Sequence, residues 1–105
     1  MRRNIVGLFA VLFFSFGAAW ADQLQSALNA QTSGDYSIAL KQFMQLAVKG
    51  NAIAQFWVGF NYDTGRGVAP DPIKALVWYR KSAAQGHPLA QRNLGDYYSM
   101  GKEGP

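Results

Sequence analysis

The sequence predicts an all-α fold, a short right-handed solenoid of antiparallel helical hairpins with about five helices after an N-terminal signal peptide. Three observations predict this fold. The chain repeats itself at a spacing of 36 residues, as between Asp35 and Asp71. Its apolar residues recur at helical intervals, and glycines or helix-capping residues separate the helical segments. At 105 residues the chain has room for one small array.

Residues 1–21 have the three parts of a secretory signal peptide. Two arginines lie near the start, an apolar run covers residues 5–14, and Ala-Trp-Ala at 19–21 matches the small-residue cleavage pattern. The alternative is an uncleaved membrane anchor, which needs about 20 apolar residues, but Ser15 and Gly17 interrupt the run. We therefore predict cleavage after residue 21 and a periplasmic or secreted location.

The first hairpin is predicted over residues 22–50. Its helices are expected at Asp22–Gln31 and Tyr36–Lys49, and the turn between them at Thr32–Asp35, where serine and glycine favour a chain reversal. Further turns are expected near Gly50, over Gly65–Pro70 and near Gly86.

The repeat itself is carried by identical residues 36 positions apart. A period in this range is typical of helical hairpins that stack because one unit cannot bury its apolar face alone. The identical pairs are Asp35/Asp71, Ala39/Ala75, Leu40/Leu76, Ala47/Ala83, Gly50/Gly86, Ala54/Ala90, Gln55/Gln91, Gly59/Gly95, Tyr62/Tyr98 and Gly65/Gly101.

The segment 72–85 shows how each helix is specified. Its apolar side chains lie on one stripe, whose members are Ala75, Leu76, Tyr79 and Ala83. Asp71 can cap the first free amides, and Pro72 at the first helical position lacks an amide that would go unpaired. Gly86 marks the end of the helix. In the preceding helix Gly59 costs about 1 kcal/mol of helix propensity, so we expect close packing of a neighbouring helix at this position.

A recognisable pattern runs through the second hairpin, which reads Gly50-Asn51-Ala52-x-Ala54-Gln55-x-x-Val58-Gly59-x-x-Tyr62-x-x-Gly65-Arg66-Gly67-Val68-x-x-Asp71-x-x-Lys74-Ala75-Leu76-x-Trp78-Tyr79-Arg80-Lys81-Ser82-Ala83-Ala84-Gln85-Gly86. This pattern closely resembles one Sel1-like repeat of the tetratricopeptide-like superfamily, so residues 51–86 are interpreted as one such unit. Residues 87–105 resemble a partial unit or a C-terminal cap. Residues 22–50 lack the Gly-x-Gly-Val loop and resemble a plain tetratricopeptide hairpin.

The resemblance implies a protein-binding function. Solenoids of this kind generally bind through the inner surface, which the first helix of each hairpin lines. By repeat position the candidate protein-binding residues are Trp57, Asn61, Asn93 and Tyr97. For Trp57 an alternative is that it packs against the Tyr36–Lys49 helix as ordinary core. The implied function is an exported adaptor that assembles or regulates a cell-envelope complex, with a protein partner whose identity the sequence does not give.

The last predicted helix differs from its counterpart on one face. Phe56 and Phe60 correspond to Arg92 and Asp96 at a spacing of 36 residues. Repeat arrays need a polar outer face at their ends. We therefore interpret the charged pair as the mark of a terminal cap.

Composition argues against several other functions. Removal of the two signal-peptide arginines leaves eight basic and six acidic residues, a net charge of +2, and the basic residues are scattered, so no nucleic-acid partner is predicted. The sequence has no cysteine and one histidine, His87, in a turn where a structural role is expected. Asp35 and Asp71 are expected to cap helices. No catalytic, cofactor or metal residue is predicted, and membrane contact is expected only through an uncleaved signal.

Two alternatives stay open. Some cysteine-rich Sel1-like proteins are described as acting on cell-wall-related compounds, so a hydrolase of that type is one alternative. The other is a truncated repeat protein with no independent activity.

Overall fold

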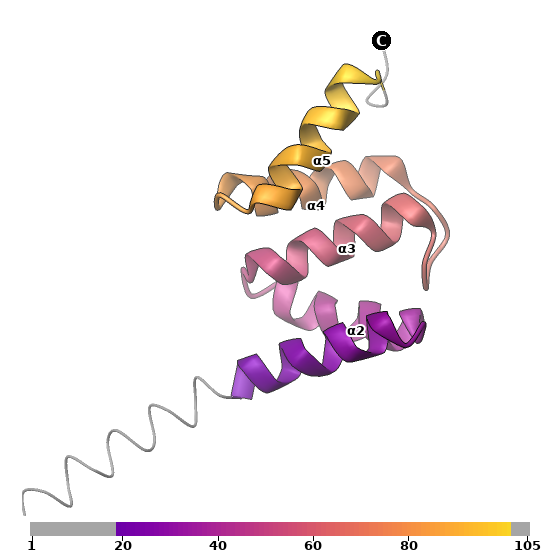
Figure 1. Cartoon of the computed structure of the whole chain (residues 1–105), viewed down its shortest axis with the longest axis vertical. Coiled ribbons are helices and arrows are strands. Elements are labelled where there is room, and N and C mark those ends of the chain that lie inside the picture. Colours follow the sequence, from indigo (N-terminus) through magenta and orange to yellow (C-terminus); the bar gives the residue numbers. More distant parts are fainter. Residues whose placement is uncertain (1–18, 102–105) are drawn as a thin grey trace, which may run out of the picture.

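The computed structural model describes residues 19–101, and this range contains five helices and no strand. A first helix covers residues 19–32, followed by α2 (Tyr36–Ala47), α3 (Ala52–Thr64), α4 (Pro72–Ala84) and α5 (Pro88–Ser99). Each helix from α2 onward packs against the next one along the chain, as Figure 1 shows. The predicted all-α fold of stacked hairpins is confirmed. Most of the predicted signal peptide, residues 1–18, lies outside the described residues.

The helices begin at capping residues. The side chain of Asn51 accepts a hydrogen bond from the Ala54 amide at 2.9 Å, and that of Asp71 accepts one from the Lys74 amide at 3.0 Å. The prediction for Asp35 was wrong in part, because this residue precedes α2 but its side chain makes no capping hydrogen bond. Its backbone, at φ −83° and ψ 63°, departs from the extended conformation that N-cap residues usually adopt.

A glycine with positive φ follows each helix within three residues, including at each of the predicted turns. The loop between α3 and α4 needs a second glycine, Gly67, for a tertiary reason. A Cβ atom there would lie 2.6 Å from the carbonyl carbon and oxygen of Tyr36, at the start of α2. The loop therefore packs its backbone directly on α2, and a side chain at this position would separate them.

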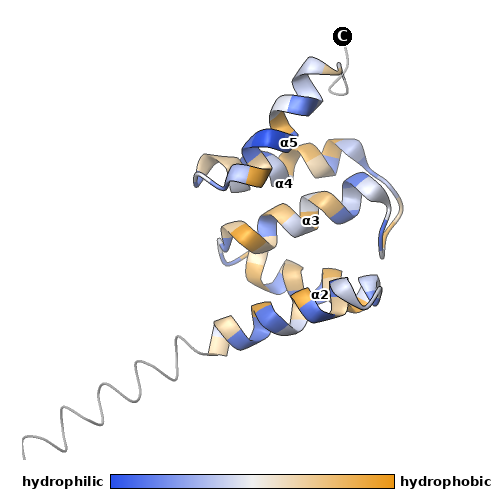
Figure 2. Cartoon of the chain, viewed as in Figure 1, coloured by the Kyte–Doolittle hydropathy of each residue, from blue (hydrophilic) through white to orange (hydrophobic). Residues whose placement is uncertain are grey.

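Two hydrophobic clusters form the core. The first surrounds Phe43 between the 19–32 helix, α2 and α3, and the second surrounds Tyr79 between α3, α4 and α5. Trp57 of α3 packs against both clusters and so connects them. In Figure 2 hydrophobic colour covers much of α3, whereas α5 carries strongly hydrophilic segments.

Close packing at Gly59 is confirmed. A Cβ atom on this residue would lie 2.8 Å from Cδ1 of Tyr79 and 3.2 Å from the carbonyl oxygen of Ala75, both in α4. Carbon atoms do not approach one another so closely in proteins. The missing side chain at Gly59 thus sets the distance between α3 and α4.

The predicted cleavage site is helical in this structure. Ala19 and Trp20, together with Gln23, Leu46 and Lys49, line a hollow of about 450 Å³. Leu46 is 3% exposed, so cleavage after Ala21 would remove part of its cover. The amide of Gln23 donates to Gln45 at 2.6 Å and would still join the first helix to α2. Within residues 19–101 we find no helix long and apolar enough to cross a bilayer.

Candidate inner-face site

Asn61, one of the four predicted binding residues, lies in the core. Its side chain is 0% exposed and exchanges two hydrogen bonds with the amide of Gln31, at 2.8 and 3.0 Å. Buried amides need such partners, because an unpaired one costs about 1–3 kcal/mol. The reciprocal pair joins α3 to the first helix, and the burial of Asn61 corrects its assignment to the binding surface.

Tyr97, the equivalent of Asn61 one repeat later, is also buried, at 2% exposed. Its hydroxyl donates to Oδ1 of Asp63 at 2.5 Å, and the Tyr79 hydroxyl donates to Oδ2 of the same carboxylate at 3.2 Å. The pKa of Tyr97 is raised, mainly by burial and to a lesser extent by the nearby Asp63 carboxylate. Burial is also the largest cause of the raised pKa of Tyr79. Both hydroxyls therefore stay protonated and donate. Tyr97 holds α5 on α3 and does not face a partner, which corrects the second assignment.

The two corrections have one explanation. Asn61 and Tyr97 occupy the same repeat position, and each bonds to the first helix of the hairpin before its own. Asn61 bonds to Gln31, 30 residues earlier, and Tyr97 bonds to Asp63, 34 residues earlier. Sequence reasoning missed both partners. One signal in the sequence indicated their burial. Asn61 follows Val58 by three residues and Tyr97 follows Leu94 by three, and residues at this spacing share one face of a helix, so each continues an apolar stripe.

Trp57 is partly buried and retains exposed surface. Its indole stacks on Phe43 of α2, with ring centroids 5.9 Å apart and planes 13° from parallel. It also meets the edges of Phe56 at 5.2 Å and Phe60 at 5.4 Å. The alternative that Trp57 packs on the 36–49 helix is thus confirmed for one side of the ring. Because Phe43, Phe56 and Phe60 restrict the indole, its exposed part is held in one position.

Asn93, the equivalent of Trp57 in α5, borders a small polar hollow. The hollow has a volume of about 130 Å³ and lies between α3 and α5, lined by Asp63, Asn93, Asp96, Tyr97 and Met100. It presents carboxylate and amide oxygens, which accept hydrogen bonds. Asp63 lies six residues after Trp57, about 9 Å further along α3. We call Trp57, Phe60, Asp63, Asn93 and Asp96 the inner-face site.

His87 has the structural role predicted for it. Its Nδ1 accepts a hydrogen bond from the Ala90 amide at 3.3 Å and so caps α5, while its ring stacks on Phe56 at 5.2 Å. Burial lowers the pKa of His87, which favours the neutral ring that can accept this bond. Among the residues that the structure describes, no group of His, Asp or Glu side chains could hold a metal ion.

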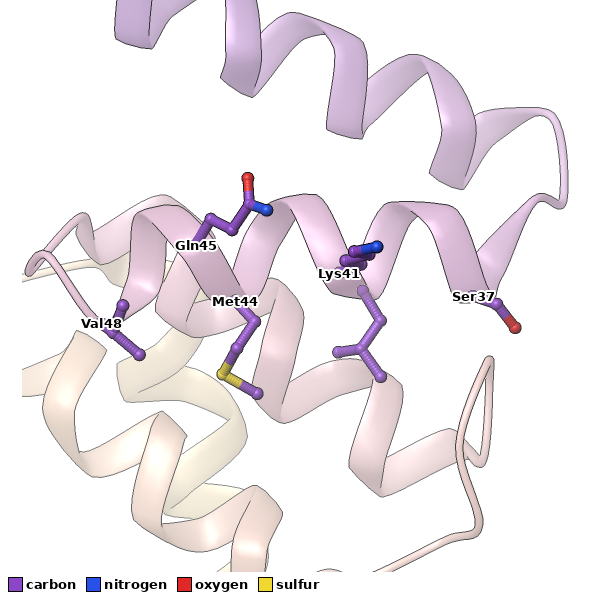
Figure 3. A pocket seen from close by; sticks show the side chains of 6 residues that line it. Ser37, Lys41, Met44, Gln45 and Val48 are labelled. Carbon is purple, nitrogen blue, oxygen red and sulfur yellow. The ribbon is translucent and has the colours of Figure 1, made fainter.

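Side chains of α2 line a wider hollow of about 460 Å³. Figure 3 shows that its lining side chains project from this single helix and its C-cap; they are Ser37, Leu40, Lys41, Met44, Gln45 and Val48. A single helix provides no opposing wall. The inner-face site differs because two successive first helices, α3 and α5, contribute to it.

Residues 52–87 match the family model of the Sel1 repeat, and residues 88–105 match it again. The chain belongs to the Sel1 repeat family. The first matched range begins at the start of α3 and ends just after α4, and the second begins at the start of α5. Repeats of this family generally mediate protein–protein interaction.

Curated relatives share the repeat within much longer chains. The chain is 44% identical over 57 residues to chitin synthase regulatory factor 3 of Schizosaccharomyces pombe. The aligned residues cover 54% of this chain and 6% of that protein. It is 41% identical over 56 residues to the ERAD-associated E3 ubiquitin-protein ligase component HRD3A of Arabidopsis thaliana, covering 52% and 8%. With DAP3-binding cell death enhancer 1 of Rattus norvegicus it shares 38% identity over 71 residues, covering 68% and 14%. The chain therefore spans 14% or less of the length of these relatives.

Proposed function

We propose that this chain is an exported adaptor that binds a segment of another protein through the inner-face site. The observation that carries the proposal is Trp57, whose ring is held by Phe43, Phe56 and Phe60 and still has exposed surface. Tryptophans fixed in this way are frequent anchors of protein interfaces, because little side-chain entropy is lost when they bind.

The chemistry of the site indicates what the partner segment supplies. An apolar side chain would pack on Trp57 and Phe60. A hydrogen-bond donor would reach the oxygens of the polar hollow, where Asp96 is exposed and Asp63 and Asn93 are partly exposed. The complementary segment therefore carries an apolar residue and a basic or amide side chain.

The names of two relatives support an accessory role. One is named a regulatory factor of chitin synthase and the other a component of a ubiquitin ligase. With the predicted signal peptide, this favours an adaptor that assembles or regulates a complex of the cell envelope.

The binding proposal is tested by affinity capture from envelope extracts of the source organism. We expect Trp57→Ala to lower recovery of the partner at least about tenfold, because an anchoring tryptophan contributes about 2 kcal/mol or more. Trp78→Ala is the matched control, since Trp78 is a partly buried tryptophan of α4 that carries the Lys81 ammonium 4.8 Å above its ring. Mass spectrometry quantifies the recovered protein.

A third variant separates binding from folding. Trp57→Phe keeps an aromatic ring against Phe43 and should retain most of the recovery. Thermal melting shows which variants remain folded at the capture temperature. Equal recovery by the parent chain and by a folded Trp57→Ala variant would remove the inner-face site from the proposal.

Export is tested by the mass of the protein produced in a bacterial host with a secretion pathway. We expect a mature chain that begins at Asp22 and is recovered outside the cytoplasm. An intact chain that keeps Met1 and stays in the cytoplasmic fraction would contradict export.

A further inference from the structure

Two successive helices, α3 and α5, begin at side-chain caps that occupy the same repeat position. Asn51 caps α3 by accepting from the Ala54 amide at 2.9 Å, and His87, 36 residues later, caps α5 by accepting from the Ala90 amide at 3.3 Å. The amide oxygen of asparagine does not titrate and stays an acceptor. An imidazole nitrogen stops accepting when it is protonated, so the cap of α5, unlike that of α3, depends on pH.

Protonation of His87 would act on α5 in two ways. Because Nδ1 accepts from the Ala90 amide, the neutral ring carries its hydrogen on Nε2, and a second proton on Nδ1 would remove the cap. The added positive charge would also lie at the N-terminus of α5, where the helix dipole disfavours cations. Both effects weaken the first turn of α5.

The charged side chains of α4 do not offset a charge on His87. They are all basic, namely Lys74, Arg80 and Lys81, and their cationic groups lie between 4.8 and 5.9 Å from aromatic ring centroids. Arg92, the first charged residue of α5, is exposed and carries the same sign. None of these charges would stabilise an imidazolium.

The carboxylates of α3 and α5 lie away from the imidazole. On α3 the ring meets Phe56, and the acidic residue of this helix, Asp63, follows seven residues later, about 10 Å along the axis. Its two oxygens accept from tyrosine hydroxyls. The acidic residue of α5, Asp96, follows His87 by nine residues, about 13 Å. The first turn of α5 has no acidic residue that could pair with a protonated His87.

The start of α5 also determines how this helix sits on α3. The imidazole of His87 stacks on Phe56, with ring centroids 5.2 Å apart, and near the other end of α5 the Tyr97 hydroxyl donates to Asp63. These two contacts hold α5 on α3. Loss of the cap loosens the first contact, because the capping side chain is also the side chain that stacks.

We propose that His87 makes the docking of α5 on α3 sensitive to acid, so that the inner-face site loses its α5 side as the pH falls below neutrality. Trp57 and Phe60 of this site belong to α3, whereas Asn93 and Asp96 belong to α5. Acid therefore weakens the polar half of the site and leaves the aromatic half in place. The inference rests on the proposed binding function, but the response of α5 is measurable without a partner.

The direction of the pH effect follows from the lowered pKa of His87. Burial holds the pKa of the docked imidazole below the value of about 6.5 that it has in an unfolded chain. The open form of α5 therefore takes up a proton at a higher pH than the docked form. Docking is strongest above about pH 6.5, weakens as the pH falls through this value, and levels off below the pKa of the docked imidazole.

Amide hydrogen exchange of the full chain, followed by mass spectrometry at about pH 7.5 and about pH 5, tests the proposal. After correction for the intrinsic exchange rate, we expect the protection of the α5 amides to fall about fivefold at the lower pH, the effect of losing one N-cap. The amides of α2 provide the internal reference. Equal protection of α5 at the two pH values would overturn the proposal.

His87→Asn is the matched control, because it places the capping residue of α3 at the start of α5. This variant should protect α5 equally at both pH values. It retains every carboxylate, so the same loss in this variant would assign the pH effect to another group and reject the role of His87. His87→Ala removes the cap at any pH, and its α5 protection should be at least about fivefold lower at both.

A titration of the imidazole by NMR checks the cause. The chain contains one histidine, so its imidazole signals belong to His87. We expect a lower titration midpoint in the folded chain than in urea. An equal or higher midpoint, as attraction of an imidazolium to the Phe56 ring would produce, contradicts the proposal. Failure of these tests leaves the binding proposal standing, whereas equal capture by Trp57→Ala would reject the site and not the acid response.

Discussion

Gly59→Leu is expected to lower the free energy of unfolding by about 3 kcal/mol. The new side chain would begin at a Cβ atom 2.8 Å from Tyr79 and 3.2 Å from the Ala75 carbonyl oxygen, where α3 and α4 are in contact. Overpacking of a filled core typically costs 1–3 kcal/mol, and here the obstacles include backbone, which cannot turn away as a side chain can. Urea denaturation followed by circular dichroism measures the change.

Gly95→Leu is the matched control because it makes the same change at the equivalent position of α5. Nothing lies within 4 Å of its Cβ position, so no overpacking is expected. Leucine also has a better helix propensity than glycine, which should add up to about 1 kcal/mol of stability. If both substitutions destabilised the chain equally, contact with α4 would not be the reason for glycine at position 59.

Asn61→Leu is expected to lower the free energy of unfolding by about 2–3 kcal/mol. It removes both hydrogen bonds to Gln31 and leaves the Gln31 amide, in a residue 7% exposed, without its partner. The cost is mainly the desolvation of that unpaired amide. The same denaturation experiment measures it. Leucine has the same number and branching of side-chain heavy atoms as asparagine, although its methyl groups take more room.

The double variant Gln31→Leu with Asn61→Leu isolates this cause. Replacing both partners of a buried hydrogen bond by apolar groups of similar shape can be nearly neutral. We therefore expect the double variant to lie within about 1 kcal/mol of the parent chain and above the single Asn61→Leu variant. Additive losses in the two single variants would show that the amide pair does not determine the stability of this contact.

These variants also separate the core from the binding surface. If Asn61 acts only through Gln31, the stable double variant should capture the same partner as the parent chain. Trp57→Ala should lose the partner. The two residues were predicted to share one surface, and the structure places only Trp57 where part of its side chain is exposed.

Several local features were predictable because they depend on residues close in sequence. The bounds of α4 follow from Asp71, Pro72 and Gly86, whose effects act within one helical turn. Close packing at Gly59 was predictable because glycine weakens a helix unless it serves another purpose. The missing side-chain cap at Asp35 was not predictable, because capping depends on a backbone conformation that the residue type alone does not impose.

The sequence by itself determined the repeat, the order of the helices and the turns between them. Tertiary structure decided which members of the repeat are buried, since equivalent residues such as Gly59 and Gly95 have the same local sequence role but different neighbours. It also paired Asn61 with Gln31 and Tyr97 with Asp63. The physical reason is that helical periodicity fixes the direction of a side chain relative to its own helix, whereas burial depends on whether another helix packs there.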